Sequence, residues 1–174
     1  MKKSLIIFVF FPYLLISQIT IEPNPFEVNQ SVTITVDINS NDTNCNSISN
    51  PDSVYMHAGI GDDNSPWGYS VVGNWGQDDG VGQMSDNGNG TWSITIVPED
   101  YFGLTASQVS SATSMGMVFR NEDGTQELKD QGCSDFFINV GAFQVELINP
   151  DNTGIILVDY NGSTQISVSY THLT

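Results

Sequence analysis

Short alternating segments, separated by turn residues, are the feature of this chain that most restricts its fold. SVTITVDIN at 31–39 and TWSITIV at 91–97 carry apolar side chains at every second position, which places Trp92 in a core. Clusters of Asn, Asp, Gly and Pro interrupt such segments from residue 19 onward. About seven short strands of this kind predict an all-β fold, an immunoglobulin-like antiparallel β-sandwich.

Two further local signals predict a hairpin and a short helix. Glu122–Asp123–Gly124 is a turn between two strand-like segments, MGMVFRN and TQELKD. Thr105 and Gln108 form a capping box, which predicts two helical turns over 106–113. Strands are also expected at 19–23 (ITIEP), 54–60 (VYMHAGI), 68–73 (GYSVVG) and 135–140 (DFFINV).

Residues 1–18 have the composition of a secretory signal peptide. Lys2 and Lys3 precede an apolar run from Leu5 to Ile16, which is too short to span a bilayer comfortably. We therefore expect a secreted or cell-surface protein, with no membrane span and with a folded domain at 19–141.

A second β domain is expected to begin within residues 142–174. FQVELINPDNTGIILVDYNGSTQIS at 143–167 repeats the strand, Asn-Pro turn and strand order found at 19–36. About 30 residues cannot build a sandwich core, so this second sandwich is expected to be truncated. The last segment, VSYTHLT at 168–174, resembles translated sequencing-adapter sequence, although its alternation also suits a strand.

The net charge limits the classes of ligand. It is −16 for the whole chain, and removal of two lysines with the signal peptide makes it −18 (−16 − 2). Arg120 and Lys129 are then the only cations. Such a surface repels nucleic acids, anionic membranes and polyanionic glycans. A neutral ligand, a cation or simple solubility all fit this charge.

The two cysteines of the chain predict a disulfide. Cys45 and Cys133 both lie in polar segments beside predicted strands, and an exported chain with an even cysteine count favours pairing. In the chain-entropy model, a bridge closing so long a loop contributes on the order of 4 kcal/mol.

Catalytic motifs are absent from the sequence. His57 is the single histidine between residues 19 and 167, and neither a G-x-S-x-G elbow, an H-E-x-x-H helix nor a P-loop is present. The acidic residues sit mainly in turns, where a carboxyl group is solvated. We expect neither a catalytic site nor a cofactor. GDDNS at 61–65 has oxygens for a structural calcium ion, but a solvated turn explains it better.

Aromatic residues gather in a glycine-rich stretch. Trp67 and Trp75 lie outside any alternation, and an exposed indole is unfavourable unless it packs or binds. Its flat apolar face suits the CH face of a pyranose. Tyr55 and His57 face away from the apolar side of their strand, and Tyr69 shares the parity of Trp67. The alternative is that the loop folds inward as a minor apolar cluster.

The order of these segments resembles a known family. VYMHAGIG, a Trp-containing loop, GNW, DNGNGTWSITIVP and MGMVFRNEDGTQELKDQG resemble the starch-binding β-sandwich modules of secreted Bacteroidetes α-amylases, over about 52–140. The resemblance implies an α-glucan ligand held by stacking aromatic rings and by polar groups of the last hairpin. The implied ligand-binding residues are Tyr55, His57, Trp67, Tyr69, Trp75, Arg120, Asn121, Lys129 and Asp130.

Two functional hypotheses follow from the sequence. The first is a non-catalytic starch-binding module of a secreted polysaccharide-degrading enzyme, whose catalytic domain would lie beyond this chain. The alternative is a structural immunoglobulin-like spacer or adhesion domain without a ligand. A spacer has no reason to expose two tryptophans, so the exposure of Trp67 and Trp75 discriminates between them.

Overall fold

The computed structural model describes residues 18–39 and 47–141, together with the backbone of three strands at 146–147, 155–160 and 164–169. The expected signal peptide, apart from Gln18, and Cys45 lie outside the described residues. Cys133 is disulfide-bonded. Its pairing with Cys45 stays a prediction.

One sheet has four antiparallel strands. They are β1 (Ile19–Glu22), β2 (Val32–Asp37), β5 (Ser85–Gly88) and β6 (Thr91–Ile96), in the order β1-β2-β6-β5. Val36 pairs with Trp92 and Ile34 with Ile94, so the apolar positions of β2 and β6 share one face. The turn between β5 and β6 contains Asn89 and Gly90, both with positive φ, which is typical of an Asn-Gly hairpin turn.

The other sheet has five antiparallel strands. They are β3 (Val54–Asp62), β4 (Ser65–Val72), β7 (Ser114–Asn121), β8 (Glu127–Leu128) and β9 (Phe136–Asn139). The order is β4-β3-β7, and both β8 and β9 pair with the far edge of β7. The predicted hairpin around Glu122–Asp123–Gly124 joins β7 to β8.

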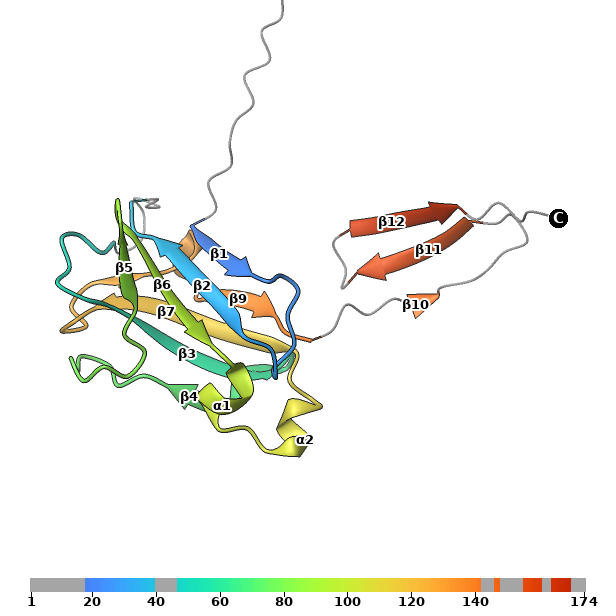
Figure 1. The fold of residues 1–174 in the computed structure, drawn as a ribbon, viewed down its shortest axis with the longest axis horizontal. Helices are drawn as coiled ribbons and strands as arrows, with labels where there is room; N and C mark the ends of the chain where they lie inside the picture. Colours follow the sequence, from blue (N-terminus) through green and yellow to red (C-terminus); the bar gives the residue numbers. More distant parts are fainter. Residues whose placement is uncertain (1–17, 40–46, 142–145, 148–154, 161–163, 170–174) are drawn as a thin grey trace, which may run out of the picture.

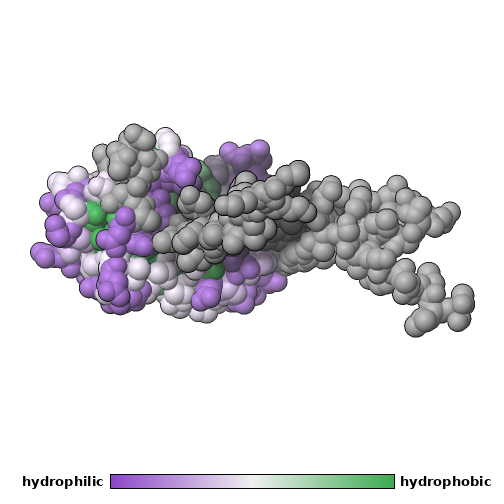
Figure 2. Space-filling view, turned by 90° about the horizontal axis from the view of Figure 1, so that it is seen from above, coloured by the Kyte–Doolittle hydropathy of each residue, from purple (hydrophilic) through white to green (hydrophobic). Residues whose placement is uncertain are grey.

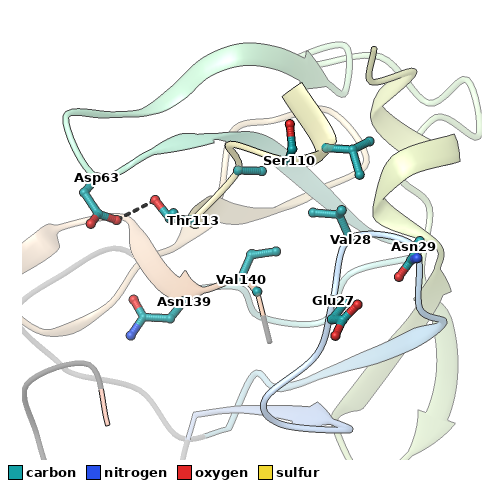
Figure 3. A pocket seen from close by; sticks show the side chains of 11 residues that line it. Glu27, Val28, Asn29, Asp63, Ser110, Thr113, Asn139 and Val140 are labelled. Carbon is teal, nitrogen blue, oxygen red and sulfur yellow. Dashed lines mark hydrogen bonds between the residues drawn. The ribbon is translucent and has the colours of Figure 1, made fainter. Parts of the chain in front are cut away.

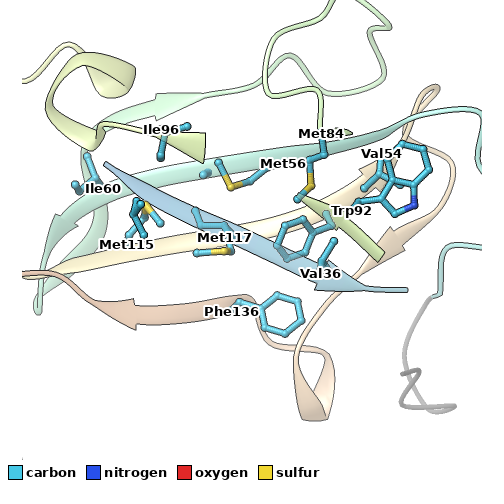
Figure 4. Close-up of a cluster of buried hydrophobic side chains, with 14 of the residues drawn as sticks. Val36, Val54, Met56, Ile60, Met84, Trp92, Ile96, Met115, Met117 and Phe136 are labelled. Atoms are coloured by element: carbon cyan, nitrogen blue, oxygen red, sulfur yellow. The ribbon is translucent and has the colours of Figure 1, made fainter. Parts of the chain in front are cut away.

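The core lies between the two sheets. Figure 4 shows Val36 and Trp92 of the first sheet among Val54, Met56 and Met117 of the second. Trp92 is 8% exposed, as its alternation predicts. The expected all-β, sandwich-like antiparallel fold is therefore confirmed.

Two short helices lie beyond the end of β6 (Figure 1). They are α1 (Pro98–Phe102) and α2 (Ala106–Val109). The predicted capping box is present, since Thr105 and Gln108 cap each other. The helix has one turn instead of two, since it ends at Val109, and the Ser110 hydroxyl donates to the carbonyls of Ala106 and Ser107. A 3₁₀ turn, η1 (Gln131–Cys133), precedes β9.

The last three strands form a separate antiparallel sheet. They are β10 (Glu146–Leu147), β11 (Ile155–Tyr160) and β12 (Thr164–Ser169), in that order. Strands are therefore present where the sequence predicts the start of a second β domain. The domain boundary itself stays a prediction. Among the described residues, no helix is long and apolar enough to cross a membrane.

Candidate functional site

Trp67 lies flat on a pair of glycines on the outer face of the five-stranded sheet. Gly59 of β3 and Gly116 of β7 are register partners. A Cβ added at Gly59 would lie 2.3 Å from Cε3 of Trp67, and one added at Gly116 would lie 2.5 Å from its Nε1. Opposite ends of one indole thus touch neighbouring strands. One ring face covers the glycines, and the other is turned away from the sheet.

The location of Trp67 corrects the sequence interpretation. GYSVVG predicts a strand that starts at residue 68, whereas β4 starts at Ser65, so Trp67 belongs to a strand and not to a loop. A register shift between Ile60 and Asp62 accompanies this pairing. Because such an irregularity re-aims side chains, the alternation could not be followed through Pro66 from the sequence alone.

His57 joins Trp67 to Trp75. Its ring centroid lies 5.8 Å from that of Trp67, with planes inclined by 29°, and 5.6 Å from that of Trp75, with planes inclined by 86°. The two indole planes are therefore steeply inclined to each other, because one is close to parallel with the imidazole and the other is almost perpendicular to it. Trp75 is 45% exposed, and Trp67 is half-buried. Three of the predicted ligand-binding residues, His57, Trp67 and Trp75, thus meet at one place.

Phe137 extends this group and was missed by the sequence analysis. It is 51% exposed and pairs with Gly116. A Cβ added at Gly116 would lie 2.9 Å from Cε1 of Phe137, so this ring also borders the pair of glycines on which Trp67 lies. Alternation in DFFINV would have turned Phe137 outward once Phe136 was assigned to the core. We call the side chains of His57, Trp67, Trp75 and Phe137 the aromatic face.

A loop at 73–81 covers one end of the same sheet. β4 pairs with β3 at residues 58–62, and the chain then leaves the sheet edge and returns to it at Gly82, whose carbonyl accepts from Met56 N. We call residues 73–81 the covering loop. It carries Trp75 and lies over the register pair Tyr55 and Arg120.

Arg120 holds the covering loop from below. Its Nη2 donates to the carbonyls of Asn74 and Gln77, both at 2.8 Å, and its Nη1 donates to the carbonyls of Asn121 and Glu122. The side chain is 0% exposed. Burial lowers the pKa of Arg120, and interactions with Tyr55, Asp79 and Asp78 oppose that shift. Arg120 is therefore a support of the loop, a correction of its expected contact with a surface ligand.

Tyr55 also lies beneath the loop. It is 1% exposed, its hydroxyl donates to Asp78, and the Arg120 guanidinium carbon stands 4.3 Å above its ring centroid. Burial, and then the hydrogen bond to Asp78, raise the pKa of Tyr55. The sequence placed Tyr55 correctly on the outer face, but the covering loop closes over it. The expected stacking of Tyr55 on a ligand is corrected to a supporting role.

The hairpin tip of β7 and β8 fixes the position of Trp75. A Cβ added at Gly124 would lie 2.9 Å from N of Gly76 and 3.0 Å from Nε1 of Trp75. Asn121 shapes this hairpin, since its Oδ1 accepts from Gln126 N. Asn121 is itself buried, so its expected ligand contact is likewise corrected to hairpin support.

The other three predicted residues make contacts with residues outside the aromatic face. The Tyr69 ring packs against the core cluster, and its hydroxyl donates to Asp62 at 3.1 Å. Lys129 Nζ lies 3.4 Å from a carboxylate oxygen of Asp135. The carboxylate of Asp130 accepts from Gln131 N and caps η1. Each of these side chains thus has a local structural partner.

The charge state of His57 is set mainly by its burial. Desolvation lowers the pKa of His57 below 6.5, the nearby Gly73 backbone and Asp135 oppose this shift, and Arg120 adds to it. Its buried Nδ1 makes no hydrogen bond of ordinary geometry. His57 is therefore neutral at pH 7 and presents an uncharged ring between the two tryptophans.

A separate hollow of about 640 Å³ lies near the end of the sandwich (Figure 3). Its wall is mixed, with Asp63 accepting a hydrogen bond from Thr113 at 2.6 Å. None of the predicted ligand-binding residues lines it. The lining residues are Glu27, Val28, Asn29, Asp63, Val109, Ser110, Ala112, Thr113, Asn139, Val140 and Gly141.

Charged residues do not assemble a metal centre in the part of the chain that the structure describes. The Asp62 carboxylate, a calcium candidate in the sequence, accepts from the backbone N–H groups of Asn64 and Ser65. The GDDNS segment is thus a side-chain-stabilised turn. Figure 2 shows a predominantly hydrophilic surface on one face of the described domain, with small apolar areas.

Comparison with known proteins gives one family. Residues 19–128 match the model of a domain of unknown function (DUF8578). No curated protein matches the chain. The matched range contains three members of the aromatic face and ends before Phe137.

Proposed function

The chain belongs to this family of unknown function, and from that premise we propose that it binds neutral carbohydrate, an α-glucan chain, through the aromatic face. The observation that carries the proposal is the seat of Trp67 on Gly59 and Gly116. Both register partners are glycines, so no side chain separates the indole of Trp67 from the strands, and the ring lies flat with its second face outward. Such a face suits the CH groups of a pyranose ring.

The charge distribution supports a neutral ligand. The chain carries 20 acidic residues against four Lys and Arg residues. Arg120 is buried and Lys129 lies beside Asp135. Within the described residues, no cation is thus available on the aromatic face to bind phosphate, sulfate or uronate groups. Polyanionic glycans and nucleic acids are disfavoured for the same reason.

The angle between the two indole planes favours a curved glucan chain as the ligand over a flat one. The ring centroids of Trp67 and Trp75 lie 5.8 Å and 5.6 Å from that of His57, so the two indoles are near neighbours with steeply inclined planes. A flat ribbon of sugars cannot lie on both rings at once. Successive rings of a bent α-linked chain can each present a face to one indole.

The proposed role is to keep a polymer near a catalytic partner. We place the protein outside the cell, and the disulfide at Cys133 suits an oxidising compartment. Binding to a dilute or insoluble glucan would raise the local concentration of substrate for a linked glycoside hydrolase domain. The carbohydrate domain itself performs no chemistry in this proposal.

Affinity electrophoresis and calorimetry on the full chain test the proposal. Soluble starch and maltooligosaccharides should bind with a dissociation constant between about 1 mM and 1 µM, because a few stacking contacts must offset the cost of association. Cellooligosaccharides and polyuronates should bind more weakly. Trp67→Ala and Trp75→Ala should each weaken binding, whereas Trp→Phe at the same positions should retain part of it. Failure of every neutral glucan to bind would refute the proposal.

The spacer hypothesis is the rival, and one observation favours it: Trp67 is half-buried and stacks with His57. A spacer would need these rings only as a cover for the sheet. The exposures of Trp75 and Phe137 argue for a ligand instead. The same glucan panel separates the two, since a spacer binds none of them.

A further inference from the structure

A row of apolar side chains crosses the five-stranded sheet at the level of the glycine pair. Val71 pairs with Gly59, Gly59 with Gly116, and Gly116 with Phe137. Register partners share a face, so all four positions look outward. Trp67 fills the two glycine positions. The row therefore reads Val71, Trp67, Phe137 and runs perpendicular to the strands.

The two ends of this row are more exposed than its centre. Val71 is 49% and Phe137 is 51% exposed, whereas Gly59 and Gly116 are buried under the indole. Three strand intervals separate β4 from β9, which at about 4.8 Å each gives about 14 Å between the end positions. The row is thus longer than a single sugar ring, and it continues past Trp67 on the side away from β4.

From this row we infer that Phe137 forms a further sugar-binding subsite, and that the oligosaccharide runs across the strands over Trp67 toward β9. The inference rests on the proposed function and deepens it, since it names the path and the third stacking residue. Phe137 suits the role because its exposed ring borders the same glycine that seats Trp67. A neutral sugar is the occupant that fits, because the chain carries a net charge of −16 and these rings are apolar.

A chain-length series tests this path. Calorimetry with maltose, maltotriose and maltohexaose compares the full chain with Phe137→Ala. In the unsubstituted protein, affinity should rise along the series as the ligand becomes long enough to cover both Trp67 and Phe137. Phe137→Ala should lower the affinity for maltotriose and maltohexaose about three- to tenfold, the effect of one stacking contact.

Matched variants separate stacking from general apolar contact. Phe137→Tyr keeps a flat ring and should retain the maltohexaose affinity, whereas Phe137→Leu should lose it. Val81 of the covering loop is also apolar and is 37% exposed, but it lies outside the row. Val81→Ala should therefore leave the affinity for maltohexaose unchanged. Because Phe137 is exposed, the melting temperature should move little in any of them.

The outcomes distinguish the inference from the function on which it rests. Suppose that binding is lost in Trp67→Ala but that Phe137→Ala binds every ligand length as tightly as the unsubstituted protein does. This result overturns the Phe137 subsite and leaves the carbohydrate function standing. A Phe137→Leu variant that keeps the full maltohexaose affinity also overturns it, since an apolar contact without a ring would then be sufficient. Absence of binding by the unsubstituted protein overturns both.

Discussion

Replacing Gly59 by alanine should displace Trp67 without touching the core. The added Cβ would lie 2.3 Å from Cε3 and 2.8 Å from Cδ2 of the indole, and ordinary contacts begin at 3.4 Å. The ring must therefore move until its Cε3 is at an ordinary contact distance from the new Cβ. Gly59 faces outward, opposite the buried side chains of Ala58 and Ile60, so the core is not overpacked.

The expected loss of stability is modest because two effects oppose each other. Overpacking typically costs about 1–3 kcal/mol, and replacing glycine in a strand recovers about 0.5–1 kcal/mol. The free energy of unfolding should fall by at most about 2.5 kcal/mol, measured by urea denaturation. Affinity for maltohexaose should fall about three- to tenfold, because the tilted ring no longer presents its face squarely.

A double-mutant cycle isolates the contact. In a Trp67→Ala background both close ring atoms are gone and only the Cα of residue 67, at 3.2 Å, remains near the new methyl group. Gly59→Ala should then be neutral or slightly stabilising, so that the coupling energy between the two substitutions equals the overpacking cost of about 1–3 kcal/mol. Additive effects, to within about 0.3–0.5 kcal/mol, would refute the seat of Trp67 on Gly59 and the site built upon it.

Four further outcomes are expected. Arg120→Lys retains the charge but cannot make the same forked contacts, so stability should fall by about 1–3 kcal/mol, with faster amide hydrogen exchange in the covering loop. Because burial lowers the pKa of His57 in the folded state, its contribution is complete above pH 6.5 and is lost as the pH falls toward the folded-state pKa; both the melting temperature and glucan affinity should drop below pH 6.5, and His57→Gln should flatten this dependence. Trp92→Ala should cost roughly 3–5 kcal/mol in chemical denaturation, as a core deletion. Intact mass of the exported protein should rise by two hydrogens on reduction if Cys45 and Cys133 are paired, and two free thiols before reduction would contradict the pairing.

Much of the architecture could be predicted from the sequence, because local alternation encodes it. A period of two in β2 and β6 is enough to place Trp92 between two sheets, and Asn-Gly and Asp-Gly turns mark the hairpins. The outward direction of His57 and Tyr55 also follows from the parity of β3. These features depend on neighbouring residues, so a single strand contains the information.

Only the tertiary structure decided which outward residues remain accessible. Tyr55 and Arg120 look like surface groups in the sequence, but the covering loop, which is distant from both along the chain, closes over their register pair. The contact that holds the loop there is a long-range one, since the carbonyl of Asn74 accepts from the Arg120 guanidinium across a separation of 46 residues in sequence. No local pattern encodes such a contact.

The aromatic face has the same long-range origin. Gly59 and Gly116 lie far apart in the sequence, and each alone is an ordinary strand glycine. Only their pairing in adjacent strands creates a flat seat wide enough for one indole. The sequence by itself determined that aromatic residues and glycines are present in alternating strands. The register between distant strands determined that they form a surface, because register depends on how the whole sheet packs on its core.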